Sequence, residues 1–226
     1  MNYAYLIFDA DETLFDFRKS ERVALKQAME EVQAAYEEEQ HLAIYQEINS
    51  AIWKELEEGT ITQKELKIER FQRFFKKMGW NIDADVFAKR YMHYLAHASF
   101  LYDGVKELIE QLHQTHRLAI ITNGLTAVQS IRVRQSEIAQ YFEHIIISEE
   151  AGVAKPDPRI FDLAVQGIDK TKLLMIGDSL SSDIAGGNQY GIDTCWLNAE
   201  QLPNQTALQP TYEIQALDEL WKVISE

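Results

Sequence analysis

Two carboxylates, Asp9 and Asp11, stand one residue apart directly after the apolar run at residues 3–8. A run of this kind, with tyrosine, isoleucine and phenylalanine, predicts a buried strand. Side chains two positions apart on extended backbone point the same way, so both acids can face one crevice. Alone, the pair could also begin an Asx-turn. Because charges are costly at the end of a buried strand, we favour a role in metal binding or catalysis.

Three further polar segments follow along the chain: Thr122-Asn123-Gly124 after an apolar run, Lys155-Pro156-Asp157-Pro158, and Gly177-Asp178 with Asp183 five residues on. Singly, the first and third could be turns between a strand and a helix, and Lys155 could be a solvated loop lysine. Together with Asp9-Ala10-Asp11-Glu12-Thr13 they resemble, in order, the four motifs of the haloacid dehalogenase (HAD) superfamily. Most members of that superfamily are magnesium-dependent phosphatases, and its motifs span nearly the whole chain.

The resemblance implies catalytic roles for individual residues. Asp9 would attack phosphorus and form an aspartyl-phosphate, which splits one hard step into two. Asp11 would protonate the leaving oxygen and then deprotonate the hydrolytic water. The Thr122 hydroxyl and the Asn123 backbone N–H would hold phosphate oxygens. Lys155 would bind the phosphate and neutralise its charge beside Asp9.

The same resemblance implies a Mg²⁺ site, since this ion prefers oxygen ligands. Its expected ligands are the Asp9 carboxylate, the Asp11 backbone carbonyl and the Asp178 carboxylate. Asp183 would orient a water molecule on the metal.

Shorter segments resemble one branch of the superfamily, the noncanonical pyrimidine 5'-nucleotidases: residues 148–157, 194–198 and Phe15-Asp16-Phe17. We therefore expect a phosphoric monoester hydrolase that acts on pyrimidine nucleoside 5'-monophosphates. The alternatives are a HAD phosphatase for a sugar phosphate or phosphoglycolate, a phosphoryl transferase of the mutase type, and a phospho-ligand binding module without turnover. Dehalogenation is disfavoured by Asp11, because a halide leaves without protonation.

The composition bounds the class of protein. The chain has 226 residues, of which 46% are hydrophobic, so it can build a sizeable core. Its net charge of −14 argues against a nucleic acid polymer as partner. A single cysteine, Cys195, allows no disulfide within the chain. No stretch has the length of a membrane span and no signal peptide is recognisable, so we expect a cytoplasmic protein without membrane contact, as a monomer or weak homodimer.

Hydrophobic periodicity predicts two kinds of region. Between the first strand and residue 100 it is helical throughout, with helices at 20–38, 41–58, 62–78 and 84–97. Thr62 with Glu65 resembles a capping box, and Gly79 follows two lysines as a helix end should. From residue 103 helices and strands alternate, with helices at 104–115, 126–138, 158–167, 181–190 and 216–225, and strands at 117–122, 144–148, 172–176, 193–197 and 212–214.

An alternation of strands and helices implies a parallel sheet covered on both faces. We therefore predict an α/β fold, with a Rossmann-like parallel-sheet core at 1–15 and 100–226 and an inserted all-helical cap at 16–99. In such sheets ligands bind beyond the carboxyl ends of the strands, where all four motifs lie. The superfamily resemblance implies that the insertion is a mobile lid over the active site.

Overall fold

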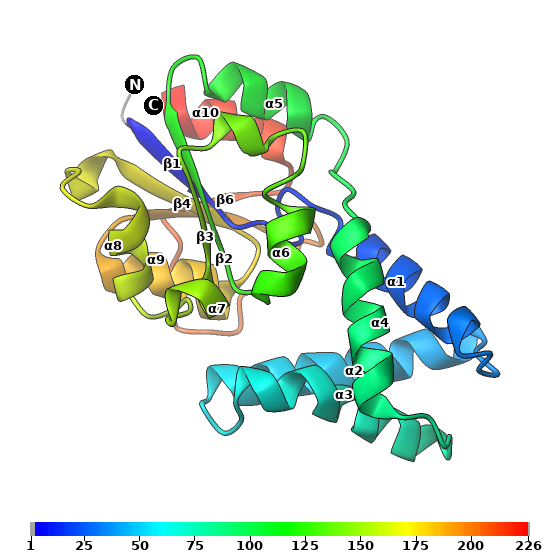
Figure 1. Cartoon of the computed structure of the whole chain (residues 1–226). Helices are drawn as coiled ribbons and strands as arrows, with labels where there is room; N and C mark the ends of the chain where they lie inside the picture. Colours follow the sequence, from blue (N-terminus) through cyan, green and yellow to red (C-terminus); the bar gives the residue numbers. More distant parts are fainter. Residues whose placement is uncertain (1–2, 226) are drawn as a thin grey trace. The chain divides into compact units, whose positions relative to one another are not determined.

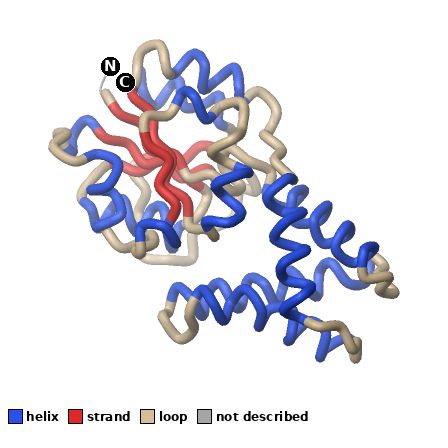
Figure 2. The backbone as a smooth tube through the Cα atoms, in the orientation of Figure 1, coloured by secondary structure: helices blue, strands red, loops and turns tan. Residues whose placement is uncertain are grey.

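The computed structural model describes residues 3–225. Contacts within the chain divide it into two compact units, residues 1–17 with 99–226 and residues 18–98. The first unit, called the core here, contains all the strands of the described chain, and the second, called the helical unit, contains helices alone (Figure 2).

The core is built on one six-stranded parallel sheet with the order β3-β2-β1-β4-β5-β6. Its strands are β1 (Tyr5–Phe8), β2 (Arg117–Thr122), β3 (His144–Ile147), β4 (Leu173–Gly177), β5 (Asp193–Leu197) and β6 (Tyr212–Ile214). Strand order reverses between β1 and β4, which is where open α/β sheets bind their ligands. The predicted Rossmann-like fold class is confirmed.

Helices cover both faces of this sheet, as Figure 1 shows with α5 and α10 on one side and α8 and α9 on the other. The core helices are α5 (Val105–Leu112), α6 (Thr126–Arg132), α7 (Ser148–Ala151), α8 (Arg159–Val165), α9 (Ala185–Tyr190) and α10 (Leu220–Ser225). Alternation along the strands explains the two layers: Leu6 and Phe8 pack with α5 and α10, whereas Tyr5 and Ile7 pack with α8.

The helical unit consists of α1 (Phe17–Glu31), α2 (Glu38–Glu57), α3 (Gln63–Met78) and α4 (Ala84–His97), with the first residue of α1 counted in the core. Its interior is aromatic, and Tyr45, Phe71 and Tyr91 pack ring against ring with centroids 5.1–5.7 Å apart. A buried polar chain crosses this interior. Asn49 donates to Glu21 at 2.9 Å and accepts from Arg70 at 3.3 Å, which ties α1, α2 and α3 together.

Three predicted helices differ most from the structure, and several others end within a few residues of their predicted bounds. The helix predicted at 20–38 ends at Glu31, because Gln33 adopts a left-handed backbone with φ +53°. The helix predicted at 126–138 ends at Arg132, and a series of turns follows it. The helix predicted at 181–190 begins as a π-helix, Leu180–Ile184, before α9 continues it.

Candidate active site

Asp9 lies at the switch point of the sheet, immediately after β1. Its backbone N–H donates to Ile176 at 2.9 Å, so the pairing of β1 with β4 extends up to this residue. The four residues of β1 are all buried, and Asp9 itself is only 8% exposed. The strand therefore places the Asp9 carboxylate at the carboxyl edge of the sheet, where it is largely shielded from water.

Lys155 supplies the positive charge next to this carboxylate. Its ammonium donates to Asp9 Oδ1 at 2.6 Å and to the Ile121 carbonyl at 2.5 Å, and it lies 2.7 Å from Asp183 Oδ1. The side chain is 1% exposed. Burial alone lowers the pKa of Lys155, but Asp183 and Asp9 outweigh that effect and raise it overall, so the lysine is charged.

Asn123 explains how Lys155 reaches this position. Its side-chain oxygen accepts from the Lys155 N–H at 2.9 Å, and its amide donates to the Lys155 carbonyl at 2.8 Å. The loop that carries the lysine is thereby fastened to the end of β2. The Asn123 side chain is committed to the fold, which agrees with the sequence expectation that its backbone N–H, and not its side chain, holds the phosphate.

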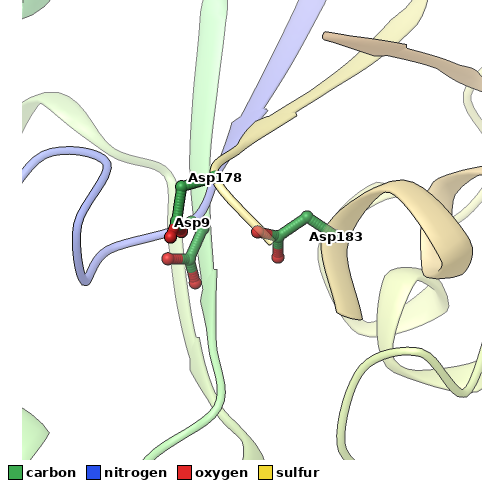
Figure 3. A group of neighbouring side chains, drawn as sticks. All are labelled: Asp9, Asp178 and Asp183. Carbon is green, nitrogen blue, oxygen red and sulfur yellow. The ribbon is translucent and has the colours of Figure 1, made fainter. Parts of the chain in front are cut away.

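Three carboxylates gather at the ends of β1 and β4 (Figure 3). Asp9, Asp178 and Asp183 each offer an oxygen within 4.8 Å of the others. Asp183 also accepts from the Ser179 N–H at 3.0 Å. Gly177 makes this approach possible, because a Cβ atom there would lie 2.2 Å from Asp183 Oδ2.

The electrostatics of this trio favour a cation. Burial raises the pKa of Asp178 above the usual carboxyl range, and Asp183 and Asp9 raise it further. Burial also raises the pKa of Asp9, although Lys155 opposes the change. One lysine cannot balance three carboxylates, so the ionised cluster carries excess negative charge at close range. A divalent cation with oxygen ligands would remove that excess, and the residues present fit such an ion.

Asp11 is not part of the trio. It lies in a tight turn in which Leu14 and Phe15 both donate to the Ala10 carbonyl at 2.9 Å, while Glu12 has a left-handed φ of +59°. The Asp11 side chain is about one quarter exposed, at 25%. Its carboxylate instead faces α6, where Gln129 Nε2 donates to Oδ2 at 3.0 Å and Arg132 Nη1 pairs with Oδ1.

Thr122 lies at the end of β2, and its hydroxyl accepts from Gln129 Nε2 at 3.0 Å. The structure thus places two site residues that the sequence motifs did not reveal, Gln129 and Arg132. The available signal was their spacing: residues three apart share a helix face, and this helix directly follows the segment at 122–124.

The other residues predicted from the sequence converge on one edge of the sheet. Lys155 pairs with Asp9 and Asp183, and the oxygens of Asp9, Asp178 and Asp183 lie within 4.8 Å of one another. Gln129 joins Thr122 to Asp11 through hydrogen bonds to both. Trp196, which lies in β5, donates from its indole N–H to the Asp178 carbonyl at 2.8 Å and so holds the residue that follows β4.

The family model for haloacid dehalogenase-like hydrolases matches residues 6–197, and the chain belongs to this family. It is therefore an enzyme of the hydrolase class.

Two relatives support the branch suggested by the short motifs. The pyrimidine 5'-nucleotidase PynA of Streptococcus pneumoniae is 41% identical over 224 residues, which cover 97% of this chain and 94% of that protein. The pyrimidine 5'-nucleotidase YjjG of Escherichia coli is 31% identical over 227 residues, covering 99% of each. The resemblance to the nucleotidase branch is thus confirmed.

A solved structure matches over the full length. The HAD-hydrolase YfnB of Bacillus subtilis, described in its crystal form as bound to magnesium and showing interdomain movement, superposes with a TM-score of 0.93. It is 34% identical to this chain, and the match covers 100% of both chains. No helix in the described part of the chain combines the length and apolar character that crossing a bilayer requires.

Proposed function

We propose that this enzyme is a magnesium-dependent phosphomonoesterase that hydrolyses pyrimidine nucleoside 5'-monophosphates through an aspartyl-phosphate. The observation that carries the proposal is the Asp9 carboxylate, buried at the switch point and paired with Lys155, beside two further carboxylates. The names of the two nucleotidase relatives support the substrate class.

In the first step, an Asp9 oxygen bonds to phosphorus while the ester P–O bond breaks. The electron pair goes to the leaving nucleoside oxygen, which takes a proton from Asp11. Lys155 holds positive charge against the phosphoryl group as it transfers, and the Thr122 hydroxyl and Asn123 N–H hold its other oxygens.

In the second step, water attacks phosphorus of the aspartyl-phosphate and gives a proton to Asp11. The P–O bond to Asp9 breaks, which regenerates the carboxylate and releases phosphate. Mg²⁺ held by Asp9, the Asp11 carbonyl and Asp178 would supply charge compensation for the phosphate in both steps. We assign to Asp183 the role of orienting a water molecule on this ion, because its carboxylate is fixed next to both Lys155 and the Ser179 N–H.

We assign to the helical unit, residues 18–98, the role of a cap that excludes water during the reaction. Its insertion directly after the loop that carries Asp11 supports this role, as does the similarity over full length to YfnB, whose crystal structure is described as revealing interdomain movement.

The test is phosphate release from a panel of monoesters with Mg²⁺: UMP, dUMP, dTMP, purine nucleotides, several sugar phosphates and phosphoglycolate. Preference for pyrimidine nucleotides supports the proposal. Preference for a sugar phosphate or phosphoglycolate would retain the chemistry and reject the substrate class. Binding without turnover of any compound would identify a phospho-ligand binding module instead.

Asp9→Asn run beside the wild type tests the covalent step. The amide is nearly isosteric but not nucleophilic, so we expect a loss of turnover of at least about 10³-fold with the fold retained. The exposed Asp103 provides a matched control, and Asp103→Asn should retain full activity. Acid-quenched mass spectrometry should find the phosphoryl group on the peptide of Asp9 in the wild type alone. Full turnover by Asp9→Asn would rule out the covalent mechanism.

A further inference from the structure

The polar face of α6 makes contacts that neither the mechanism nor the family motifs use. Gln129 and Arg132 are 1% and 0% exposed, respectively, so both are buried polar side chains. Burial of such groups is costly unless their hydrogen bonds are made. Here the bonds go to the two residues proposed to hold the proton and the phosphate, Asp11 and Thr122.

The Arg132 guanidinium lies close to two aromatic rings. Its guanidinium carbon lies 5.3 Å from the ring centroids of both Phe15 and Phe17. The Ser99 hydroxyl donates to its backbone carbonyl at 2.7 Å, which fixes the end of α6 as well. A planar guanidinium stacks on such rings, whereas a lysine ammonium does not share this geometry.

The guanidinium directs its hydrogen bonds to one side. Nη1 pairs with Asp11 Oδ1 and donates to Gln129 Oε1 at 3.0 Å. Nε and Nη2 are buried and have no hydrogen-bond partner within residues 3–225. A group that served only to tie the fold together would be expected to use its remaining donors, since leaving them unmade is unfavourable. The arrangement directs Nη1 at the Asp11 carboxylate and at Gln129, which itself contacts Asp11.

Gln129 connects this carboxylate to the phosphate position. Its Nε2 lies 3.0 Å from Asp11 Oδ2 and 3.0 Å from Thr122 Oγ1, and its Oε1 accepts from Arg132. The close approach requires a glycine at position 124, because a Cβ atom there would lie 2.7 Å from Gln129 Cγ. Each Asp11 oxygen accepts one bond from α6 and keeps a lone pair for a substrate or water.

We propose that Gln129 and Arg132 are positioning residues that hold the Asp11 carboxyl group for proton transfer to the leaving oxygen of the substrate. This inference rests on the proposed function. Proton transfer is sensitive to geometry, because the carboxyl group must lie within hydrogen-bond reach of the leaving oxygen. Two directed contacts on the two Asp11 oxygens restrict both rotation of the carboxyl group and its distance from Thr122.

The test compares two substrates that differ in their need for a proton. A nucleoside 5'-monophosphate has an alkoxide leaving group that must be protonated, whereas p-nitrophenolate leaves p-nitrophenyl phosphate without protonation. The readout is kcat/KM, which covers the steps up to departure of the leaving group. For Arg132→Met we expect a loss of about 100-fold on the nucleotide, since this is a common contribution of general acid catalysis, and only a minor loss on p-nitrophenyl phosphate.

Further variants separate positioning from folding. Gln129→Met is of similar size and leaves the pair of Arg132 and Asp11 in place. Like Arg132→Met, it should lower kcat/KM more on the nucleotide than on p-nitrophenyl phosphate. It should also lower kcat/KM on both substrates, because the donor to Thr122 is missing. Arg132→Lys should fall between the wild type and Arg132→Met. Arg134→Met removes an exposed arginine that pairs with Glu150, and it should leave the ratio unchanged.

The outcomes are distinguishable from a failure of the proposed function. If the wild type releases phosphate from none of the monoesters, the proposed function itself is wrong. If the wild type is active and folded Arg132→Met and Gln129→Met lose activity equally on both substrates, the positioning role is wrong. A selective loss on the nucleotide, partly recovered in Arg132→Lys, supports the inference.

Discussion

At the scale of single residues, one buried lysine compensates part of the negative charge of the site. Lys155 contacts Asp9 and Asp183 and is itself fastened through its backbone to Asn123. A buried ion pair contributes little net stability, but removing one partner leaves an uncompensated charge and is strongly destabilising. We therefore expect the lysine to stabilise the core in the absence of metal, in addition to its proposed role in catalysis.

Lys155→Met should lower the free energy of unfolding of the metal-free protein by about 3 kcal/mol, because Asp9 and Asp183 lose their compensating charge. Added Mg²⁺ should restore more stability to the variant than to the wild type, since the ion replaces the missing positive charge. Urea unfolding with and without Mg²⁺ measures both effects. Lys106→Met, which removes a half-exposed lysine paired with Glu137, is the control and should show little change. An equal gain from Mg²⁺ in the variant and the wild type would contradict this account.

Sequence reasoning reached most of the residues that converge on the site, since Asp9, Thr122, Lys155 and Asp178 each follow a recognisable strand or motif. It did not reach Gln129 and Arg132. A polar residue on an amphipathic helix is normally solvated, and a local pattern does not show when the polar face is turned inward. Their burial depends on how α6 is placed against the turn that carries Asp11, which is a tertiary property.

At the scale of elements, local chemistry predicted helix ends well where the caps are made by side chains. The predicted capping box of α3 is present, with Thr62 accepting from the Glu65 N–H at 3.3 Å and the Glu65 side chain accepting from the Thr62 N–H at 2.8 Å. Gly79 ends the helix in a left-handed conformation with φ +69°. The helix predicted at 126–138 is too long because hydrophobic periodicity, and not a cap, set its end. Val133 and Ile138 are both fully buried beyond the end of α6, so the apolar pattern continues although the helix does not.

The capping box should make the first turn of α3 sensitive to acid. The pKa of Glu65 is lowered from its usual value of 4.5, mainly by the backbone N–H of Thr62 and then by its hydroxyl. Just below pH 4.5 the unfolded state therefore binds more protons at Glu65 than the folded state does. The stabilisation of the helix by Glu65 is fully present above that pH, and it is lost as the pH falls through the lower pKa of Glu65 in the folded state.

Hydrogen exchange of α3 peptides, corrected for intrinsic rates, measures this loss. In the wild type, protection of the first turn should decline on acidification, whereas in Glu65→Gln it should already be reduced and depend less on pH. Thr62→Ala should resemble Glu65→Gln, because it removes the hydroxyl that accepts from the Glu65 N–H. The same dependence on pH in the wild type and Glu65→Gln would show that the box does not stabilise the helix.

At the scale of the whole molecule, the chain has two compact units with separate interiors. The core interior lies on the two faces of the sheet, whereas the interior of the helical unit is formed by aromatic rings. All residues proposed to hold the metal lie in the core. A ligand stabilises only the unit that binds it, unless the two units unfold together.

We therefore expect Mg²⁺ to protect the core selectively. At about 100 times its dissociation constant, a ligand of the folded state adds about 2.7 kcal/mol. Hydrogen exchange should slow in peptides of β1 and β4, whose ends carry Asp9 and Asp178, and should remain unchanged in peptides of α3. Removing the ion with a chelator should reverse the protection. Asp178→Asn should abolish it, whereas Asp103→Asn should retain it. Equal protection in β1 and α3 would mean that the two units unfold as one cooperative body. Protection that persists in Asp178→Asn would place the metal outside the trio of carboxylates.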